Sequence, residues 1–403
     1  MKDLLILLIC IVLLVSCVPR KSIIESDPVP IGSDYPTDAE TDIDEGDVLA
    51  YFSTTTFRDI VKSNYKENIV YSPYSYGQAI NQLTKITDDF KKNDLIKRFY
   101  NKDISGIKLS NIKTANLIMA NREFFDLKEN APDNLKLASF PKEAENISRE
   151  LQEKIIGKVL LEPEYDKEQS NIILNATKFD GKWVKPFESK NTIEDAEFKT
   201  FDGVEKVNLM TEENPDGKLG YEDEYAAVTR KEIKSDNKNQ KSYAYILVPK
   251  ETREEYLEKI ALNIGTYIYH INHMPGEYDS VILQIPKIDL KSKLDLLKLA
   301  KENFYGLEKP FKLKEDVLLS KSSDSVAINE IKQVATLSID EREVKAEAVT
   351  EIGMKLTSAP SQEKKTLEVI ANRPYFVVLT SESENGIELI TFTALVNNPN
   401  KTE

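Results

Sequence analysis

Residues 344–357 alternate between two kinds of side chain, and this alternation constrains the fold more than any other feature of the sequence. The first kind is apolar or small and grows along the segment: Val344, Ala346, Ala348, Thr350, Ile352, Met354 and Leu356. The second kind is mostly charged: Lys345, Glu347, Val349, Glu351, Gly353 and Lys355. Successive side chains of a β-strand point to opposite faces, so this period of two predicts a long strand with one face on a core.

The residues that follow have the composition of a loop. They read Thr-Ser-Ala-Pro-Ser-Gln-Glu-Lys-Lys from Thr357 to Lys365. Clusters of Ser, Thr and Pro next to a periodic segment are typical of loops. On these residues alone, an ordinary edge strand followed by a loop is one explanation.

Helical patterns dominate the first part of the chain and strand patterns the later part. Amphipathic spacing predicts a helix from about Val48 that ends before Asn68. Ser72-Pro73 predicts the start of a second helix, because Ser caps helices and Pro suits the first turn. A third helix is expected over residues 145–156, and runs rich in β-branched and aromatic residues predict strands at 171–175, 242–248, 280–284 and 375–379. This order indicates an α+β fold.

The N-terminus has the pattern of an export signal. The apolar stretch over residues 4–16 is shorter than the about 20 residues that span a bilayer, so it fits the core of a signal peptide. It leads into Leu14-Val15-Ser16-Cys17, which resembles the bacterial lipobox, in which the cysteine is lipidated and the preceding residues are removed. We therefore expect a signal peptide over residues 1–16 and a lipid on Cys17. The alternative is an ordinary signal peptide or an anchor with a chance cysteine.

Residues 17–47 are expected to form a lipidated N-terminus and an acidic, flexible linker. Residues 24–47 hold nine Asp or Glu and no Lys or Arg, and such a segment buries too little apolar surface to order itself. Cys10 lies in the segment to be removed. The mature chain then has no disulfide, and a single folded domain over residues 48–403 depends on its core alone. The predicted location is the cell envelope, as an exported protein anchored by lipid to the outer membrane or the cell surface.

Composition and motifs argue against several classes of function. The net charge of -14 opposes nucleic-acid binding, since phosphates would be repelled. The chain lacks a glycine-rich phosphate loop and a CxxC pair. His270 and His273 could share a helix face and hold zinc with one acidic residue, but their aromatic and apolar neighbours favour a packed helix. We expect a protein that is not an enzyme and that carries no metal and no cofactor.

Separate blocks of the sequence resemble the serpin family. Asn175-Ala-Thr-Lys-Phe-Asp-Gly-Lys-Trp183, followed by Lys185-Pro186-Phe187, resembles the family pattern N-A-x-x-F-x-G-x-W-x-x-P-F. The other blocks are Asn68–Ser75, Ile147–Val159, Phe198 with Phe201–Met210, Arg373–Phe376 and Phe392–Pro399. In this order they extend the resemblance from about Val48 to Pro399.

The resemblance implies a fold and a mechanism. The fold is the α+β serpin fold, with three β-sheets, about eight or nine helices and an exposed reactive-centre loop. A serine or papain-like cysteine protease attacks the loop and forms an acyl-enzyme, and the cut loop inserts into the large sheet as a new strand. Insertion carries the protease away and distorts its active site before deacylation. The alternating segment would supply that strand, in a protein expected to be a monomer.

The resemblance also assigns residues to roles. The family's spacing from Glu341 places the reactive bond at Thr357-Ser358, with Lys355 and Leu356 as alternates, whereas a count back from Pro374 places it near Glu363-Lys364. The hinge and inserting face comprise Glu343, Val344, Ala346, Ala348 and Thr350. The shutter cluster under the sheet comprises Ser72, Ser75, Asn175 and Gln333.

Three of these positions depart from the family pattern. Glu343 replaces a glycine and Val344 replaces a small residue at the hinge, and Gln333 replaces the shutter histidine. The first two changes would slow insertion. A second hypothesis is therefore a serpin-fold surface protein that does not inhibit and serves as a ligand carrier, adhesin or chaperone.

Overall fold

The computed structural model describes eight ranges of the chain: residues 45–89, 109–160, 162–274, 276–298, 307, 309–323, 325–344 and 365–401. Internal contacts divide the chain into residues 1–42 and a compact unit over residues 43–403. All described residues belong to the second unit.

Five α-helices have both ends within the described ranges: α2 (Glu45–Asn64), α3 (Pro73–Ile86), α5 (Lys142–Ile156), α6 (Glu254–Leu262) and α7 (Ile264–His273). Residues 296–298 are helical as well. Ser72 caps α3 by accepting a hydrogen bond from the Ser75 amide at 3.3 Å. α5 ends at Gly157, whose φ of 90° is easy only for glycine. These starts and stops follow the sequence signals, and α5 begins three residues earlier than predicted. In the same ranges, no helix has the length and apolar character needed to cross a membrane.

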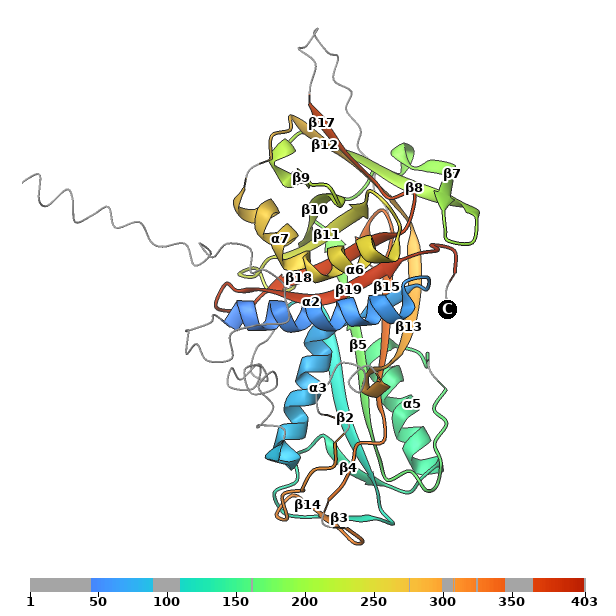
Figure 1. Ribbon diagram of the computed structural model, residues 1–403, viewed down its shortest axis with the longest axis vertical. Coiled ribbons are helices and arrows are strands. Elements are labelled where there is room, and N and C mark those ends of the chain that lie inside the picture. The colour runs from blue at the N-terminus through green and yellow to red at the C-terminus, as the bar shows by residue number, and fades with distance from the viewer. Residues whose placement is uncertain are drawn as a thin grey trace, which may run out of the picture. The chain divides into compact units, whose positions relative to one another are not determined.

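A five-stranded sheet contains the strands that form the candidate functional site. Its order is β13 (Ile288–Asp295), β15 (Ile331–Ile339), β5 (Asn171–Phe179), β2 (Ile112–Asn121) and β4 (Leu135–Ala138). α3 and α5 pack on its two faces, as Figure 1 shows. Alternate residues of β5 account for this: Ile173 joins the core with α3, whereas Leu174 packs against Ile156 of α5.

An eight-stranded sheet forms the second layer. Its order is β1 (Ile69–Tyr71), β19 (Glu388–Val396), β18 (Tyr375–Glu382), β11 (Ser242–Pro249), β10 (Ala226–Lys234), β6 (Gly181–Trp183) and β16 (Glu343–Val344), with β9 (Gly220–Glu222) paired to β10. A four-stranded sheet follows in the order β17 (Thr366–Ile370), β12 (Ser280–Pro286), β8 (Val204–Asn214) and β7 (Ile193–Lys199). β14 (Leu318–Ser320) and β3 (Phe125–Leu127) form a short ribbon.

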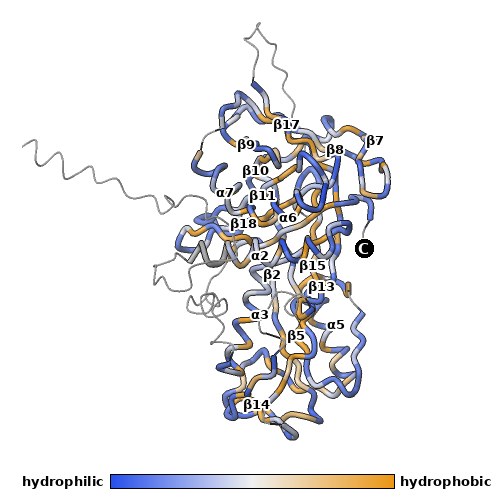
Figure 2. The backbone as a smooth tube through the Cα atoms, in the orientation of Figure 1, coloured by the Kyte–Doolittle hydropathy of each residue, from blue (hydrophilic) through white to orange (hydrophobic). Residues whose placement is uncertain are grey.

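The strands at the centre of the eight-stranded sheet are buried on both faces. Phe376 of β18 lies in the core that contains the helices, while its neighbour Tyr375 lies in the core shared with the four-stranded sheet. Because both faces are covered, almost every residue of β11, β18 and β19 is buried. Figure 2 shows hydrophobic stretches of backbone among hydrophilic ones in the described residues. The strands predicted at 171–175, 242–248, 280–284 and 375–379 are all present and each is longer than predicted.

The predicted α+β class and its three principal sheets are confirmed. The prediction of eight or nine helices concerns the whole chain, and the described ranges account for the five α-helices above and for the short 3-10 turns Ser189–Asn191 and Gly217–Leu219. The predicted reactive-centre loop falls on residues 345–364, outside the described residues.

Candidate functional site: a parallel seam in the five-stranded sheet

β5 and β15 lie side by side and run parallel, and we call their contact the seam. Their register runs from Ile331 opposite Ile173 to Thr336 opposite Lys178. On their outer sides, β5 pairs antiparallel with β2 and β15 pairs antiparallel with β13. A strand that entered the seam antiparallel to both would replace one parallel pairing by two antiparallel pairings, which are slightly more stable per residue.

The chain leaves β15 through a tight turn and comes back along the line of β5. After Asp340–Arg342, β16 pairs antiparallel with β6, with Glu343 opposite Lys182 and Val344 opposite Gly181. Trp183 of β6 holds the turn, because its indole Nε1 donates to the Asp340 carbonyl at 2.9 Å and its amide donates to the Arg342 carbonyl at 3.2 Å. The predicted hinge residues Glu343 and Val344 thus form β16, which runs antiparallel to β6.

Glu341 connects the same turn to the segments that contain Lys287 and Thr192. Its carboxylate lies 2.5 Å from Lys287 Nζ and accepts a hydrogen bond from Thr192 at 3.2 Å. Burial opposes the ionised carboxylate, but the hydrogen bond and charge of Lys287, together with hydrogen bonds from a backbone amide and from Thr192, outweigh it and hold the pKa of Glu341 below its ordinary value. Sequence reasoning did not predict the roles of Lys287 and Thr192, because both lie far from Glu341 in the chain.

A buried ion pair lies beside Trp183, whose ring centre is 5.6 Å from Lys231 Nζ. Lys231 is paired with Glu212, and its ammonium lies 4.5 Å from the centre of the Phe187 ring. Burial lowers the pKa of Lys231, while Glu212 acts in the opposite direction. The block Asn175–Phe187 that carried the family resemblance is therefore the corner that connects the seam to the turn.

The four predicted shutter residues meet beneath the seam, and all four are fully buried. The Gln333 side chain holds the backbone of Ser72 from both sides, because its Oε1 accepts from the Ser72 amide at 2.8 Å and its Nε2 donates to the Ser72 carbonyl at 3.0 Å. Ser72 Oγ donates in turn to the Thr391 carbonyl at 2.7 Å. The amide of Gln333 thus ties β15 to the start of α3 with a group that does not titrate.

Asn175 ties β5 to the same helix. Its Nδ2 donates to the side chains of Ser75 and Asn116, and Ser75 Oγ also contacts Thr114 Oγ1. Asn175 Oδ1 is buried and has no hydrogen-bond partner among the described residues. Thr114, Asn116 and Thr391 complete this cluster and were not predicted, because polar residues inside strands have no sequence signal of their own.

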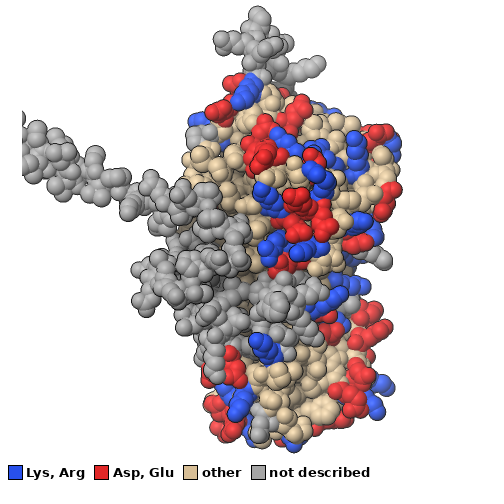
Figure 3. All heavy atoms as spheres, viewed as in Figure 1, with Lys and Arg blue, Asp and Glu red and all other residues tan. Residues whose placement is uncertain are grey.

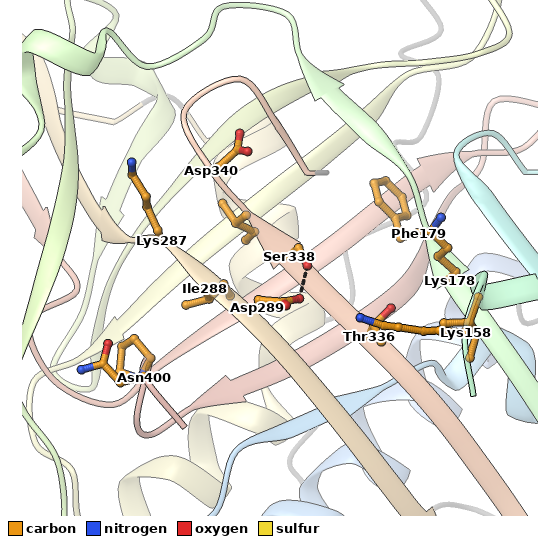
Figure 4. A pocket seen from close by; sticks show the side chains of 13 residues that line it. Lys158, Lys178, Phe179, Lys287, Ile288, Asp289, Thr336, Ser338, Asp340 and Asn400 are labelled. Atoms are coloured by element: carbon orange, nitrogen blue, oxygen red, sulfur yellow. Dashed lines mark hydrogen bonds between the residues drawn. The ribbon is translucent and has the colours of Figure 1, made fainter. Parts of the chain in front are cut away.

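A cavity of about 540 Å³ opens at the end of the seam on the α5 side. Figure 4 shows that Lys178, Thr336, Ser338 and Asp289 line it, and that Ser338 is hydrogen-bonded to Asp289. Lys178 also forms an ion pair with Asp180 at 3.0 Å. The seam therefore ends beside an opening that is lined by both charged and apolar side chains, Phe179 and Ile288 among the latter.

Several predicted site residues fall outside the described residues: Cys17, Ala346, Ala348, Thr350, Lys355, Leu356, Thr357 and Ser358. Their roles stay predictions. The described site residues belong to the sheets and to α3. Glu343 and Val344 are the last residues that the structure describes before the predicted loop.

The two histidines pack on α7 against aromatic rings. His270 stacks on Tyr221 with ring centres 4.3 Å apart, and His273 stacks on Tyr269 at 4.6 Å. Burial lowers the pKa of His270. Across the part of the chain that the structure describes, no three His, Cys, Asp or Glu side chains come together as a metal-ion site.

Solved structures share this architecture. The thermophilic serpin tengpin in its native state has a TM-score of 0.69 at 20% identity, with 89% of this chain and 96% of that chain covered. Arabidopsis AtSerpin1 in its native stressed conformation has a TM-score of 0.68 at 16% identity, covering 89% of this chain and all of that chain (100%). Human thyroxine-binding globulin complexed with its hormone scores 0.64 at 16% identity, with 89% and 100% covered.

The sequence itself was compared in two ways. No curated protein matches the chain significantly. A family model described as serpin (serine protease inhibitor) matches residues 120–399, which is more than half of the chain. Together with the seam, the three sheets and the fold shared with solved serpins, this match shows that the chain belongs to the serpin family.

Proposed function

We propose that this serpin inhibits serine and papain-like cysteine endopeptidases by trapping them as acyl-enzymes. The observation that carries the proposal is the geometry of the seam. β5 and β15 form a parallel pair. The chain that leaves β15 pairs antiparallel with β6, the strand that follows β5 after one residue. Residues 345–357 follow in the alternating pattern of a strand.

The chemistry begins with the protease nucleophile. Its hydroxyl or thiol attacks the carbonyl carbon of Thr357, the bond to Ser358 breaks, and the new amine of Ser358 leaves with a proton. Thr357 is then held to the protease as an ester or thioester. Insertion of residues 345–357 into the seam would move the attached protease before water completes hydrolysis. A protease that cuts at Lys355 or Leu356 would leave a slightly shorter strand.

The direct test is the formation of an SDS-stable complex with members of a protease panel. Ala346→Arg is the informative variant, because the family's inserting face needs a small side chain there and charge is costly inside a sheet core. We expect the native protein to form the complex and the variant to be cleaved as a substrate while its native fold is unchanged. Equal trapping by both proteins would contradict insertion.

We also propose that the domain is held at the cell envelope of a bacterium by a lipid on Cys17, with the acidic residues up to 47 as a spacer. The support is the Leu14-Val15-Ser16-Cys17 motif. Cys17→Ser should release the protein from membranes or stall its maturation, as fractionation and the mass of the mature N-terminus will report. Unchanged membrane association of this variant would contradict lipidation of Cys17.

A second candidate is a serpin-fold binding protein without inhibition. Glu343 and Val344 at the hinge favour it, since the resemblance expects smaller residues there. The solved thyroxine-binding globulin, complexed with its hormone, shows that a protein of this fold can hold a small ligand. Nucleic acid is not an expected partner of either candidate, and basic and acidic side chains are interspersed on the face drawn in Figure 3.

A further inference from the structure

The cavity of about 540 Å³ beside the five-stranded sheet has the size of a small-molecule site, since such sites occupy about 300–1,000 Å³. Its walls come from the ends of β5, β13, β15 and α5 and from residues that follow β19. The apolar residues that line it are Ile156, Phe179, Ile288, Ile339 and Pro399. These walls favour a ligand with an apolar body, because binding removes apolar surface from water.

One side of the cavity carries positive charge. Lys178 of β5 and Thr336 of β15 are register neighbours, and Lys158 follows the end of α5 by two residues. Figure 4 shows these three side chains on the same side of the cavity. Lys178 and Lys113 both pair with Asp180, at 3.0 Å and 3.7 Å, and so share one carboxylate. Lys158 adds a third positive charge.

These groups have the chemistry of a carboxylate-binding site. The ammonium groups of Lys158 and Lys178 and the hydroxyl of Thr336 are hydrogen-bond donors that line the same cavity. Hydrogen bonds between ammonium and carboxylate groups are stronger than those between neutral groups. A ligand that places one carboxylate among the three donors would therefore be attracted by charge and held by hydrogen bonds.

The rest of the cavity would repel a second negative charge. Asp289 and Asp340 both line it, and Figure 4 shows Asp340 on the side away from Lys178. Lys287 lines the cavity near Asp340, but its ammonium is already paired with Glu341 at 2.5 Å. Carboxylates at this end make a second anionic group on the ligand unfavourable.

The spacing of the two ends sets a length for the ligand. Asp289 accepts a hydrogen bond from Ser338, which lies two residues, or about 7 Å along the strand, from Thr336. An extended chain of about eight carbons that begins at Thr336 is long enough to reach Asp289. The far end of such a chain has to be uncharged or positive.

We propose that this cavity binds an amphipathic organic carboxylate that carries a single negative charge. Its carboxylate contacts Lys158, Lys178 and Thr336, and its aliphatic body packs on Ile156 and Phe179. The inference is separate from the proposed trapping of proteases, because the ligand contacts side chains that line the cavity and no strand enters or leaves the sheet.

Calorimetric titration of the full-length protein with three eight-carbon probes tests the site. Octanoate has the carboxylate and the aliphatic body, octylamine has an ammonium instead, and octanedioate has a second carboxylate. We expect octanoate to bind and the other two to bind at least about fivefold more weakly. Octylamine brings its charge to Lys158 and Lys178, and octanedioate brings its second charge to Asp289.

Variants of the lining residues locate the bound probe. Lys158→Gln and Thr336→Val should each weaken octanoate binding about threefold or more, because each removes one donor to the carboxylate. Lys154→Gln is the matched control, since Lys154 is an exposed lysine of α5 that does not line the cavity. Asp289→Asn should raise the affinity for octanedioate toward that for octanoate. Circular dichroism checks that each variant keeps the native fold.

Several results would overturn the proposal. These are no binding of octanoate, equal binding of octanoate and octylamine, equal losses in Lys154→Gln and Lys158→Gln, or no gain for octanedioate in Asp289→Asn. Protease trapping by the same protein is measured separately. A protein that traps proteases but binds no octanoate keeps the proposed function and loses this site, and the reverse result loses only the proposed function.

Discussion

The seam between β5 and β15 differs from the centre of the eight-stranded sheet in the direction of its strands and in what surrounds them. At the seam, two parallel strands meet above a polar cluster and beside a cavity. In β11, β18 and β19 the strands are antiparallel and buried on both faces, mostly through apolar side chains. Separating the latter would expose two cores to water, whereas the seam separates at hydrogen bonds that another strand can replace.

The polar cluster connects each strand of the seam separately to α3. Gln333 ties β15 to Ser72, and Asn175 ties β5 to Ser75. Each strand is therefore fastened to the first turn of α3 and not, through these side chains, to the other strand. We call β11, β18 and β19 the scaffold, because burial on both faces opposes their separation, and we expect the seam to be the easier of the two regions to open.

Cleavage of residues 352–364 should produce the largest effect that separates the two regions. If the freed strand enters the seam, the cut protein gains backbone pairings and buried surface that the intact protein lacks. We expect its melting temperature to rise on the order of 10 °C or more, since a large domain gains about 2–4 °C per kcal/mol. Calorimetry of intact and nicked protein checks this. Identical melting would mean that the seam is as fixed as the scaffold.

A mutation in the scaffold should act alike on both forms. Phe376 is fully buried in β18 and packs edge-on against Phe57, with ring centres 6.0 Å apart. Phe376→Ala should cost about 3–5 kcal/mol in intact and in cleaved protein, because it leaves a cavity where β18 packs against Phe57 of α2. Val184→Ala, at a side chain that is 45% exposed, is the control and should change stability by less than about 0.5 kcal/mol. A much smaller cost after cleavage would show that the scaffold moves too.

The scaffold was the easier region to predict from the sequence. Runs such as residues 375–379 are apolar because both faces are buried, and a cap such as Ser72 acts within one turn of helix. Local chemistry therefore predicted the existence of these elements. Their lengths were underestimated, because pairing with neighbours such as β19 extends β18 into Thr380 and Ser381, which are polar yet buried.

The seam was predicted only in part. Family resemblance pointed to Ser72, Ser75, Asn175 and Gln333, and the structure brings them together. Lys287, Thr192, Asn116 and Thr391 were missed, because each acts through a contact between segments distant in the chain. Such contacts depend on the sheet order, which the periodicity of a single sequence does not determine.

The smallest expected effect lies at the turn that leaves the seam. Glu341 and Lys287 hold this turn, and the pKa of Glu341 lies below its ordinary value of 4.5. A carboxyl group whose folded pKa is depressed contributes stability that is fully present above its unfolded pKa and is lost as the pH falls through its folded pKa. We therefore expect Glu341→Gln to destabilise the protein by about 1 kcal/mol or less at neutral pH. The difference from the native protein should shrink below pH 4.5.

Urea unfolding of both proteins between neutral pH and the acid range measures this difference. Glu188→Gln is the matched control, because Glu188 is paired with Lys190 at 2.8 Å while both side chains remain exposed. Water and salt screen such a pair, so its loss should leave stability unchanged at every pH. A constant difference for Glu341→Gln across the range would mean that the turn depends on the shape of this side chain and not on its charge. Packing of the Glu341 side chain would then stabilise the turn after β15, as packing stabilises the scaffold.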